Sequence, residues 1–167
     1  MFTLQNLVIA LALVLFAWYF IGVIVGRQRG ATLVREIRSA LEGTGKTFLI
    51  KWFGRSAFQV DVSEPASPLK GLQVFCLLEP RDFALALAWN RIRRRRDQVI
   101  ISASYMSPPP ALVRHPLESY GIPGLSAMEV GPESPHVRLT LQVGVGNEGA
   151  IRTALEWLRH NHVKKRA

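Results

Sequence analysis

The chain has 167 residues, 49% of them hydrophobic, and a formal net charge of +9. Without its apolar N-terminus the length suits one small domain with a hydrophobic core and excludes two such domains. The single cysteine, Cys76, excludes an intrachain disulfide. Its place in the apolar run 72–78 indicates a buried side chain. The basic charge favours anionic partners, namely lipid headgroups, nucleic acid or an acidic protein surface.

Residues 7–26 form an uninterrupted stretch of 20 uncharged, mostly apolar residues. In a helix that rises about 1.5 Å per residue, such a stretch crosses the roughly 30 Å hydrocarbon layer of a bilayer. A cleaved signal peptide is the alternative. It requires a basic leader and small residues before the cleavage site, whereas residues 1–6 carry no basic side chain. We therefore predict a transmembrane anchor over residues 1–26.

Basic residues follow this stretch, and none precedes it. Arg27, Arg29, Arg35 and Arg38 come directly after the apolar residues. Short loops rich in Lys and Arg stay on the cytoplasmic side of a membrane. The sequence thus predicts a single-pass plasma-membrane protein with its N-terminus outside and its C-terminal domain in the cytoplasm.

The first elements after the anchor alternate between turn signals and apolar patterns. Within a juxtamembrane segment 27–46, residues 32–41 have the spacing of an amphipathic helix, which Gly43 and Gly45 should end. Two strands joined by a short turn at Gly54 are predicted over 48–53 and 57–62. The run 72–78 is more uniformly apolar and indicates a central strand.

The second half of the domain adds further strands and helices. Residues 80–92 favour a helix because of their alanines, although alternation over 83–89 would also fit a strand. Strands are predicted over 98–105, 137–143 and, more weakly, 125–130, and an amphipathic helix is predicted over 150–159. Strands that are polar on one side imply a mainly antiparallel sheet covered by helices on its other face. The fold class is therefore α+β, a two-layer α/β sandwich over residues 47–167.

Residues 107–136 form a proline-rich loop, with three consecutive prolines from Pro108 to Pro110. A connection of this length without periodicity is unusual inside a compact domain. It is either a docking segment for a partner or a long surface loop packed on its own domain, and the sequence leaves both open.

Two glycine motifs resemble nucleotide-binding loops without their context. The segment 43–47, GTGKT, follows a predicted helix and opens a strand, which is the reverse of a P-loop. We interpret it as a helix stop. The segment 144–149, GVGNEG, fits a tight turn better than a dinucleotide site, because no further parallel strand is predicted after it, although amides at a helix start could hold an anion. We expect no cofactor.

No catalytic or metal-binding constellation is visible. The four histidines have no metal-ligand spacing with Cys76 or with a pair of acids, and no nucleophile–base pair can be nominated from the scattered carboxylates. We therefore favour a protein that is not an enzyme and holds no metal.

The strongest local signal is an arginine run at 91–96, RIRRRR. Five positive charges within six residues repel each other and contribute little to a fold. A helix end and Asp97 account for two or three of them, so an anionic surface explains the run better than a solvated helix end. The candidate lipid- or partner-binding residues are Arg91, Arg93, Arg94, Arg95, Arg96, Arg27 and Arg29.

These patterns support a membrane-tethered interaction domain whose basic face meets anionic headgroups or an acidic partner, as in an accessory subunit of a membrane complex. Two alternatives remain. One is a membrane-bound enzyme that acts on a lipid or another small substrate. The other is a nucleic-acid-binding domain held at the membrane, which is less expected because no known reading motif is present.

Overall fold

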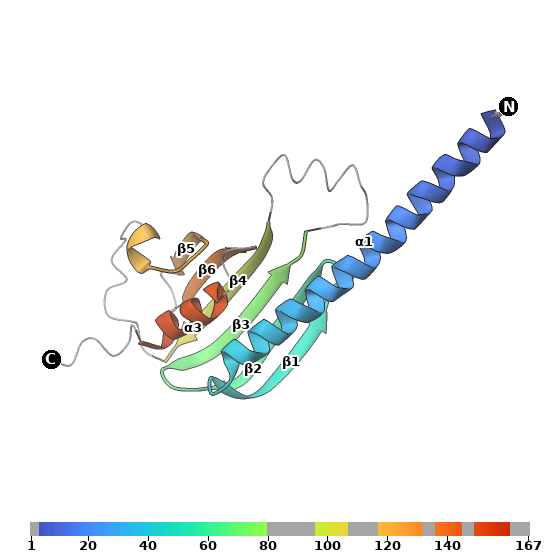
Figure 1. Ribbon diagram of the computed structural model, residues 1–167. Coiled ribbons are helices and arrows are strands. Elements are labelled where there is room, and N and C mark those ends of the chain that lie inside the picture. The colour runs from blue at the N-terminus through green and yellow to red at the C-terminus, as the bar shows by residue number, and fades with distance from the viewer. Residues whose placement is uncertain (1–3, 80–95, 107–116, 132–135, 145–148, 161–167) are drawn as a thin grey trace.

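The computed structural model describes residues 4–79, 96–106, 117–131, 136–144 and 149–160 (Figure 1). A long N-terminal helix is followed by a six-stranded antiparallel sheet and a C-terminal helix, so the predicted α+β class is confirmed. The elements in chain order are α1 (Leu4–Leu41), β1 (Gly45–Trp52), β2 (Ala57–Pro65), β3 (Leu69–Leu77), β4 (Asp97–Tyr105), a 3₁₀ turn η1 (Leu117–Tyr120), β5 (Leu125–Gly131), β6 (His136–Val143) and α3 (Ala150–His160).

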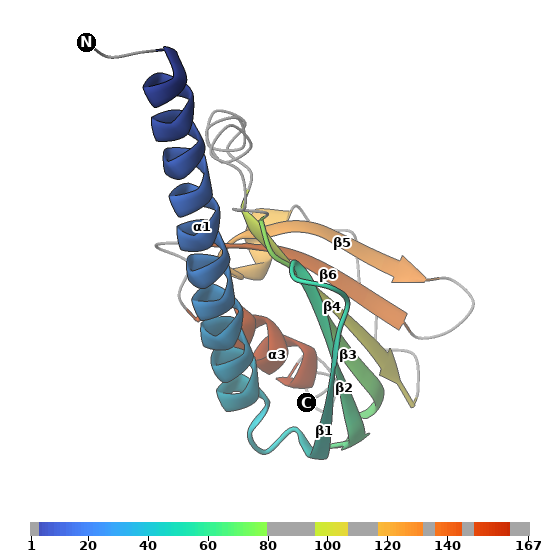
Figure 2. The same ribbon diagram turned by 90° about the vertical axis from the view of Figure 1, so that its right-hand side faces the viewer.

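The sheet has the strand order β1-β2-β3-β4-β6-β5, and every neighbouring pair is antiparallel. The C-terminal half of α1 and the whole of α3 cover one face of the sheet (Figure 2). Within the described residues no helix covers the other face, which carries polar side chains such as Gln59, Gln73 and Ser102. The domain is therefore the two-layer sandwich that the alternating strands predict.

Alternation along β2, β3, β4 and β6 builds the core between the two layers. Val60, Val74, Ile101 and Leu139 are direct cross-strand partners in one row, and each is at most 2% exposed. A shift of one residue in any of these pairings would turn an apolar row towards solvent, so burial itself fixes the register.

The C-terminal half of α1 belongs to this core. Leu33, Ile37 and Leu41 recur every four residues on one side of the helix, and none is more than 1% exposed. Burying a side chain of this size stabilises a fold by about 1.5–3 kcal/mol, so this stripe attaches the helix firmly to the sheet.

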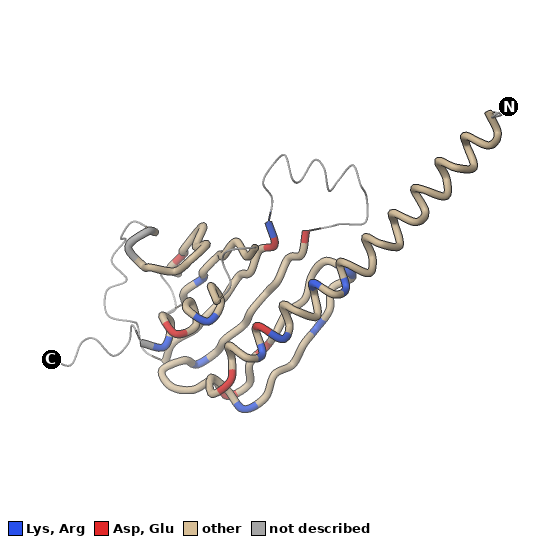
Figure 3. The backbone as a smooth tube through the Cα atoms, viewed as in Figure 1, with Lys and Arg blue, Asp and Glu red and all other residues tan. Residues whose placement is uncertain are grey.

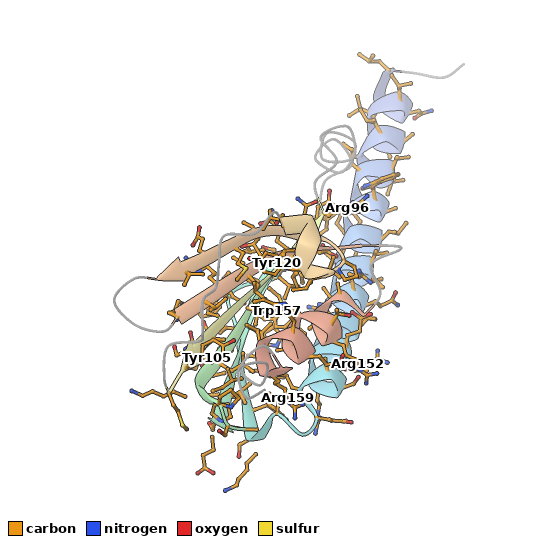
Figure 4. All side chains as sticks on the ribbon, turned by 90° about the vertical axis from the view of Figure 1, so that its left-hand side faces the viewer. Arg96, Tyr105, Tyr120, Arg152, Trp157 and Arg159 are labelled. Atoms are coloured by element: carbon orange, nitrogen blue, oxygen red, sulfur yellow. The ribbon has the colours of Figure 1, made fainter. Side chains whose placement is uncertain are left out.

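The C-terminal helix α3 buries Ile151, Ala154, Leu155 and Leu158 beside α1. The Tyr105 hydroxyl, at the end of β4, donates a hydrogen bond to the carbonyl oxygen of Leu158 at 3.0 Å. Tyr120 meets Trp157 edge to face, with ring centroids 5.3 Å apart (Figure 4). These contacts fix the end of α3 to the sheet.

The helix α1 stops where the glycines predict. Gly43 has a φ of +77°, which glycine adopts without strain. The Thr44 amide then donates to the Leu41 carbonyl at 2.8 Å, and β1 begins at Gly45. The helix-stop interpretation of residues 43–47 is confirmed, and Lys46 lies in a strand. The final residues of the segment 27–46 therefore belong to a turn and to β1.

Several predictions fall on residues outside the described ranges. They are the helix over 80–92, most of the arginine run, residues 107–116 and 132–135 of the proline-rich loop, and residues 145–148 of the glycine motif interpreted as a tight turn. The described parts of that loop include η1 and β5, and the short strand predicted over 125–130 is confirmed within β5.

Gly30 allows the closest approach of α1 to the end of β1. A Cβ atom at this position would lie 3.1 Å from Trp52 Cη2 and 3.3 Å from Leu78 Cδ1. Gly30→Leu should displace Trp52 and lower the melting temperature in detergent by several degrees, an overpacking penalty of about 1–3 kcal/mol. The control is Ala31→Leu, one exposed residue further along, which should leave the melting temperature almost unchanged. Equal melting of the two variants would contradict the tight contact.

Candidate membrane interface

One end of the sheet lies beside the point where α1 leaves the domain, and we name it the anchor end (Figure 1). Here β1 and β3 finish and β2 and β4 begin. It comprises Trp52, the turn 53–56, residues 77–79, and Arg96 with Asp97. Figure 3 shows charged positions of both signs just after the end of β3 and at the start of β4.

The N-terminal half of α1 projects from the anchor end without covering any strand (Figure 2). Its large apolar side chains are exposed, from Leu4 at 79% to Phe20 at 49%. By length and composition α1 is long and apolar enough to cross a membrane. The helix has no break between this exposed half and the half that packs in the core.

The turn between β1 and β2 reaches along α1. The Arg55 guanidinium donates from Nη1 to the Tyr19 hydroxyl at 2.8 Å, and its carbon lies 6.0 Å from the centre of the Tyr19 ring. Trp52 packs on Phe58, with ring centroids 4.8 Å apart, and half of its surface remains exposed. Phe53 is similarly exposed although its ring is 6.0 Å from that of Phe75. The turn therefore combines a cation with two exposed aromatic rings.

An ion pair joins α1 to the anchor end of the sheet. Arg29 Nε donates to Asp97 Oδ2 at 3.1 Å, and the Glu79 amide donates to Asp97 Oδ1 at 2.9 Å. The Asp97 side chain is only 3% exposed, and that of Arg29 is 28% exposed. A carboxylate buried to this degree must be paired and hydrogen-bonded, so Asp97 fixes both the helix and the end of β3.

The structure brings some of the predicted site residues together at the anchor end. Arg27 is exposed on α1, while Arg29 is half-buried in the ion pair with Asp97. Arg96 is exposed at the beginning of β4, close to Gly144 (Figure 4). Arg91, Arg93, Arg94 and Arg95 lie outside the described residues.

Sequence reasoning missed the turn residues Trp52, Phe53 and Arg55. A signal was present, because two aromatic residues stand directly before the predicted turn and a cation follows Gly54. Their connection to the anchor could not be predicted, since the contact between Arg55 and Tyr19 joins residues 36 positions apart.

Two features of the described residues bear on catalysis, namely potential metal ligands and the thiol of Cys76. No group of three potential metal ligands occurs among the described residues. Cys76 is fully buried, as predicted. Burial, with a smaller effect of the Asp97 charge, raises the pKa of its thiol to about 12. The thiolate required of a nucleophile is therefore scarce at neutral pH.

A second surface feature is a groove of about 390 Å³ between α1 and β1. Val34, Ile37, Phe48 and Ile50 line it, and Arg38 and Lys46 are among its polar residues. It opens beside β1, which is the edge strand of the sheet.

No protein-family model matches the chain, and no curated protein is significantly similar to it in sequence.

The ion pair between Arg29 and Asp97 should contribute to the free energy of unfolding. Asp97→Ala should leave the Arg29 guanidinium and the Glu79 amide without this carboxylate. The expected loss is about 2–3 kcal/mol, below the 3–5 kcal/mol of a fully buried pair because Arg29 keeps some contact with water. Thermal or urea unfolding in detergent measures it.

The matched control is Glu64→Ala, which removes the exposed pair with Lys46, whose side chains are 81% and 69% exposed. That pair should contribute less than about 1 kcal/mol. Similar losses in the two variants would show that Asp97 does not hold α1 to the sheet.

Proposed function

We propose that this chain is a single-pass plasma-membrane protein whose cytoplasmic domain presents its basic anchor end to anionic lipid headgroups, as an interaction domain or accessory subunit of a membrane complex. The observation that carries the proposal is the continuity of α1. The exposed apolar half of this helix and its Leu33–Ile37–Leu41 stripe, buried in the core, belong to one unbroken element. If the first half crosses a bilayer, the second half holds the domain at the membrane surface in one orientation.

Charge supports the same orientation. Arg27 and Arg96 are exposed at the anchor end, Arg55 lies in its turn, and the sequence adds four arginines within the five residues before Arg96. Each Lys or Arg close to an anionic leaflet contributes about 1 kcal/mol of attraction. An acidic protein surface would offer the same charge, and the vesicle experiment below separates the two.

The first test uses the fragment 27–167, which keeps the buried stripe of α1, after circular dichroism has confirmed that it folds. It should bind vesicles with acidic lipids and ignore neutral ones. Replacing Arg93, Arg94, Arg95 and Arg96 with Gln should remove up to about 4 kcal/mol of attraction, or up to roughly a thousandfold in partitioning. High salt should weaken the binding, because the Debye length falls from about 10 Å at 0.1 M to about 3 Å at 1 M.

The control variant loses the same number of positive charges, but at four other positions. Lys46, Lys70, Arg138 and Arg159 lie at strand starts or at the end of α3, remote from the anchor end. Their replacement by Gln should weaken binding much less. Equal weakening of vesicle binding in the two variants would mean that net charge attracts the domain to the membrane without orienting it. Absence of vesicle binding by the parent fragment would leave an acidic protein as the partner.

The second test concerns topology. A reporter fused after Ala167 should be active only in the cytoplasm, because the arginines after residue 26 keep the domain on that side. Activity of an exported reporter would contradict the proposed orientation. A mature N-terminus near Arg27 would show that residues 1–26 are a cleaved signal peptide.

A further inference from the structure

If α1 crosses a bilayer, the position of a residue along this helix gives its depth in that bilayer. Residues 7–26 would extend about 30 Å at 1.5 Å per residue, the thickness of the hydrocarbon layer. Tyr19 stands seven residues before Gly26, so it lies about 10 Å inside the end of this segment. Gly30 stands four residues beyond Gly26, about 6 Å outside it.

Two contacts with α1 then give the depth of the β1–β2 turn and of the end of β1. The Arg55 guanidinium bonds to the Tyr19 hydroxyl, so the tip of the β1–β2 turn lies beside Tyr19 within the reach of one arginine side chain. Trp52 packs against Gly30 at the end of β1. The polar headgroup layer is about 5–7 Å thick on each side of a bilayer. Trp52 thus lies at headgroup depth, and the turn beyond it lies at the margin of the hydrocarbon.

The exposure of α1 agrees with this depth. Gly22 is buried and Tyr19, Val23 and Gly26 are half-buried, whereas every residue from Leu4 to Trp18 is exposed. This fully open part of the helix is about 22 Å long, which is less than the hydrocarbon layer. A bilayer of ordinary thickness around α1 would therefore meet the domain.

The side chains at that depth have interfacial chemistry. Trp52 and Phe53 are 51% and 52% exposed, and Leu77 at the end of β3 is 39% exposed. Tryptophan and tyrosine concentrate at the boundary between headgroups and acyl chains. An arginine stem can lie along apolar surface while its charged head meets a polar partner, which for Arg55 is the Tyr19 hydroxyl.

We propose that the β1–β2 turn, with Trp52, Phe53 and Arg55, inserts into the cytoplasmic interface of the bilayer beside α1. It forms a second attachment that fixes the tilt of the domain. Lipid is the occupant because the turn lies beside the apolar helix α1 through the hydrogen bond between Arg55 and Tyr19, and because it exposes two aromatic rings there. This inference rests on the proposed membrane tether and adds to it a specific lipid-contacting element.

The test uses the full chain in vesicles with acidic lipids and one nitroxide label per variant. Cys76 is the single native cysteine, and its buried thiol with a raised pKa gives little background labelling. Ser56→Cys places a label in the turn, and Ser63→Cys places one near the other end of β2, seven residues or about 23 Å along the strand. Both serines are exposed. Leu11→Cys, in the part of the apolar segment where every side chain is exposed, reports on the tether itself.

The measurement is the ratio of collisions with oxygen, which enriches in lipid, to collisions with a water-soluble nickel complex. We expect a several-fold higher ratio at Ser56 than at Ser63, and the highest ratio at Leu11. Phe53→Gln should lower the ratio at Ser56. The control Leu49→Gln should not, because Leu49 is equally exposed but four residues further from the anchor end.

The failures are distinguishable. Low ratios at both Ser56 and Leu11 would overturn the membrane tether together with the inference. A high ratio at Leu11 with equal, water-like values at Ser56 and Ser63 would keep the tether and overturn the insertion. A Ser56 label shielded from both reagents would mean that protein covers the turn, which also overturns insertion into lipid.

Discussion

The structure depends on a single helix that must satisfy two environments. The first half of α1 exposes apolar side chains on all sides, while its second half exposes charge on one side and buries Leu33, Ile37 and Leu41 on the other. Apolar residues on every side suit lipid, and a stripe suits packing on a sheet. Because backbone hydrogen bonding is continuous in a helix, a rotation or shift of one half would displace the other. The packing of the domain core therefore sets the orientation of the exposed half.

Contacts along one side of α1 fix this rotation. Tyr19 meets Arg55, Arg29 pairs with Asp97, and Gly30 accommodates Trp52. These positions continue the stripe of Leu33, Ile37 and Leu41 towards the N-terminus at helical spacing. The nature of the contacts changes along the stripe, from aliphatic packing to a partly buried ion pair and then to a tyrosine–arginine hydrogen bond. The polar contacts are specific in direction, so they select one rotation among those that aliphatic packing alone would allow.

Sequence could predict what depends on neighbouring residues. Alternation identifies 57–62 and 137–143 as strands because a half-buried sheet needs a period of two, and Gly43 ends a helix because it adopts a positive φ. Sequence could not predict partners that are distant along the chain. Arg29 has the local character of a juxtamembrane lipid contact, and its pairing with Asp97, 68 residues away, exists only in the fold. The placement of β6 between β4 and β5 is equally nonlocal.

The edge strand β1 has an open side that must be protected from pairing with other strands. A strand at the end of a sheet leaves backbone groups open to unwanted pairing, and natural sheets protect such edges with charge or by covering them. Towards its start, β1 has Lys46, which pairs with Glu64, and further along Lys51 pairs with Asp61. At its end, charge gives way to Trp52 and Phe53. Charge thus protects this edge at both Lys46 and Lys51, and the exposed rings of Trp52 and Phe53 follow only where the chain reaches the anchor end.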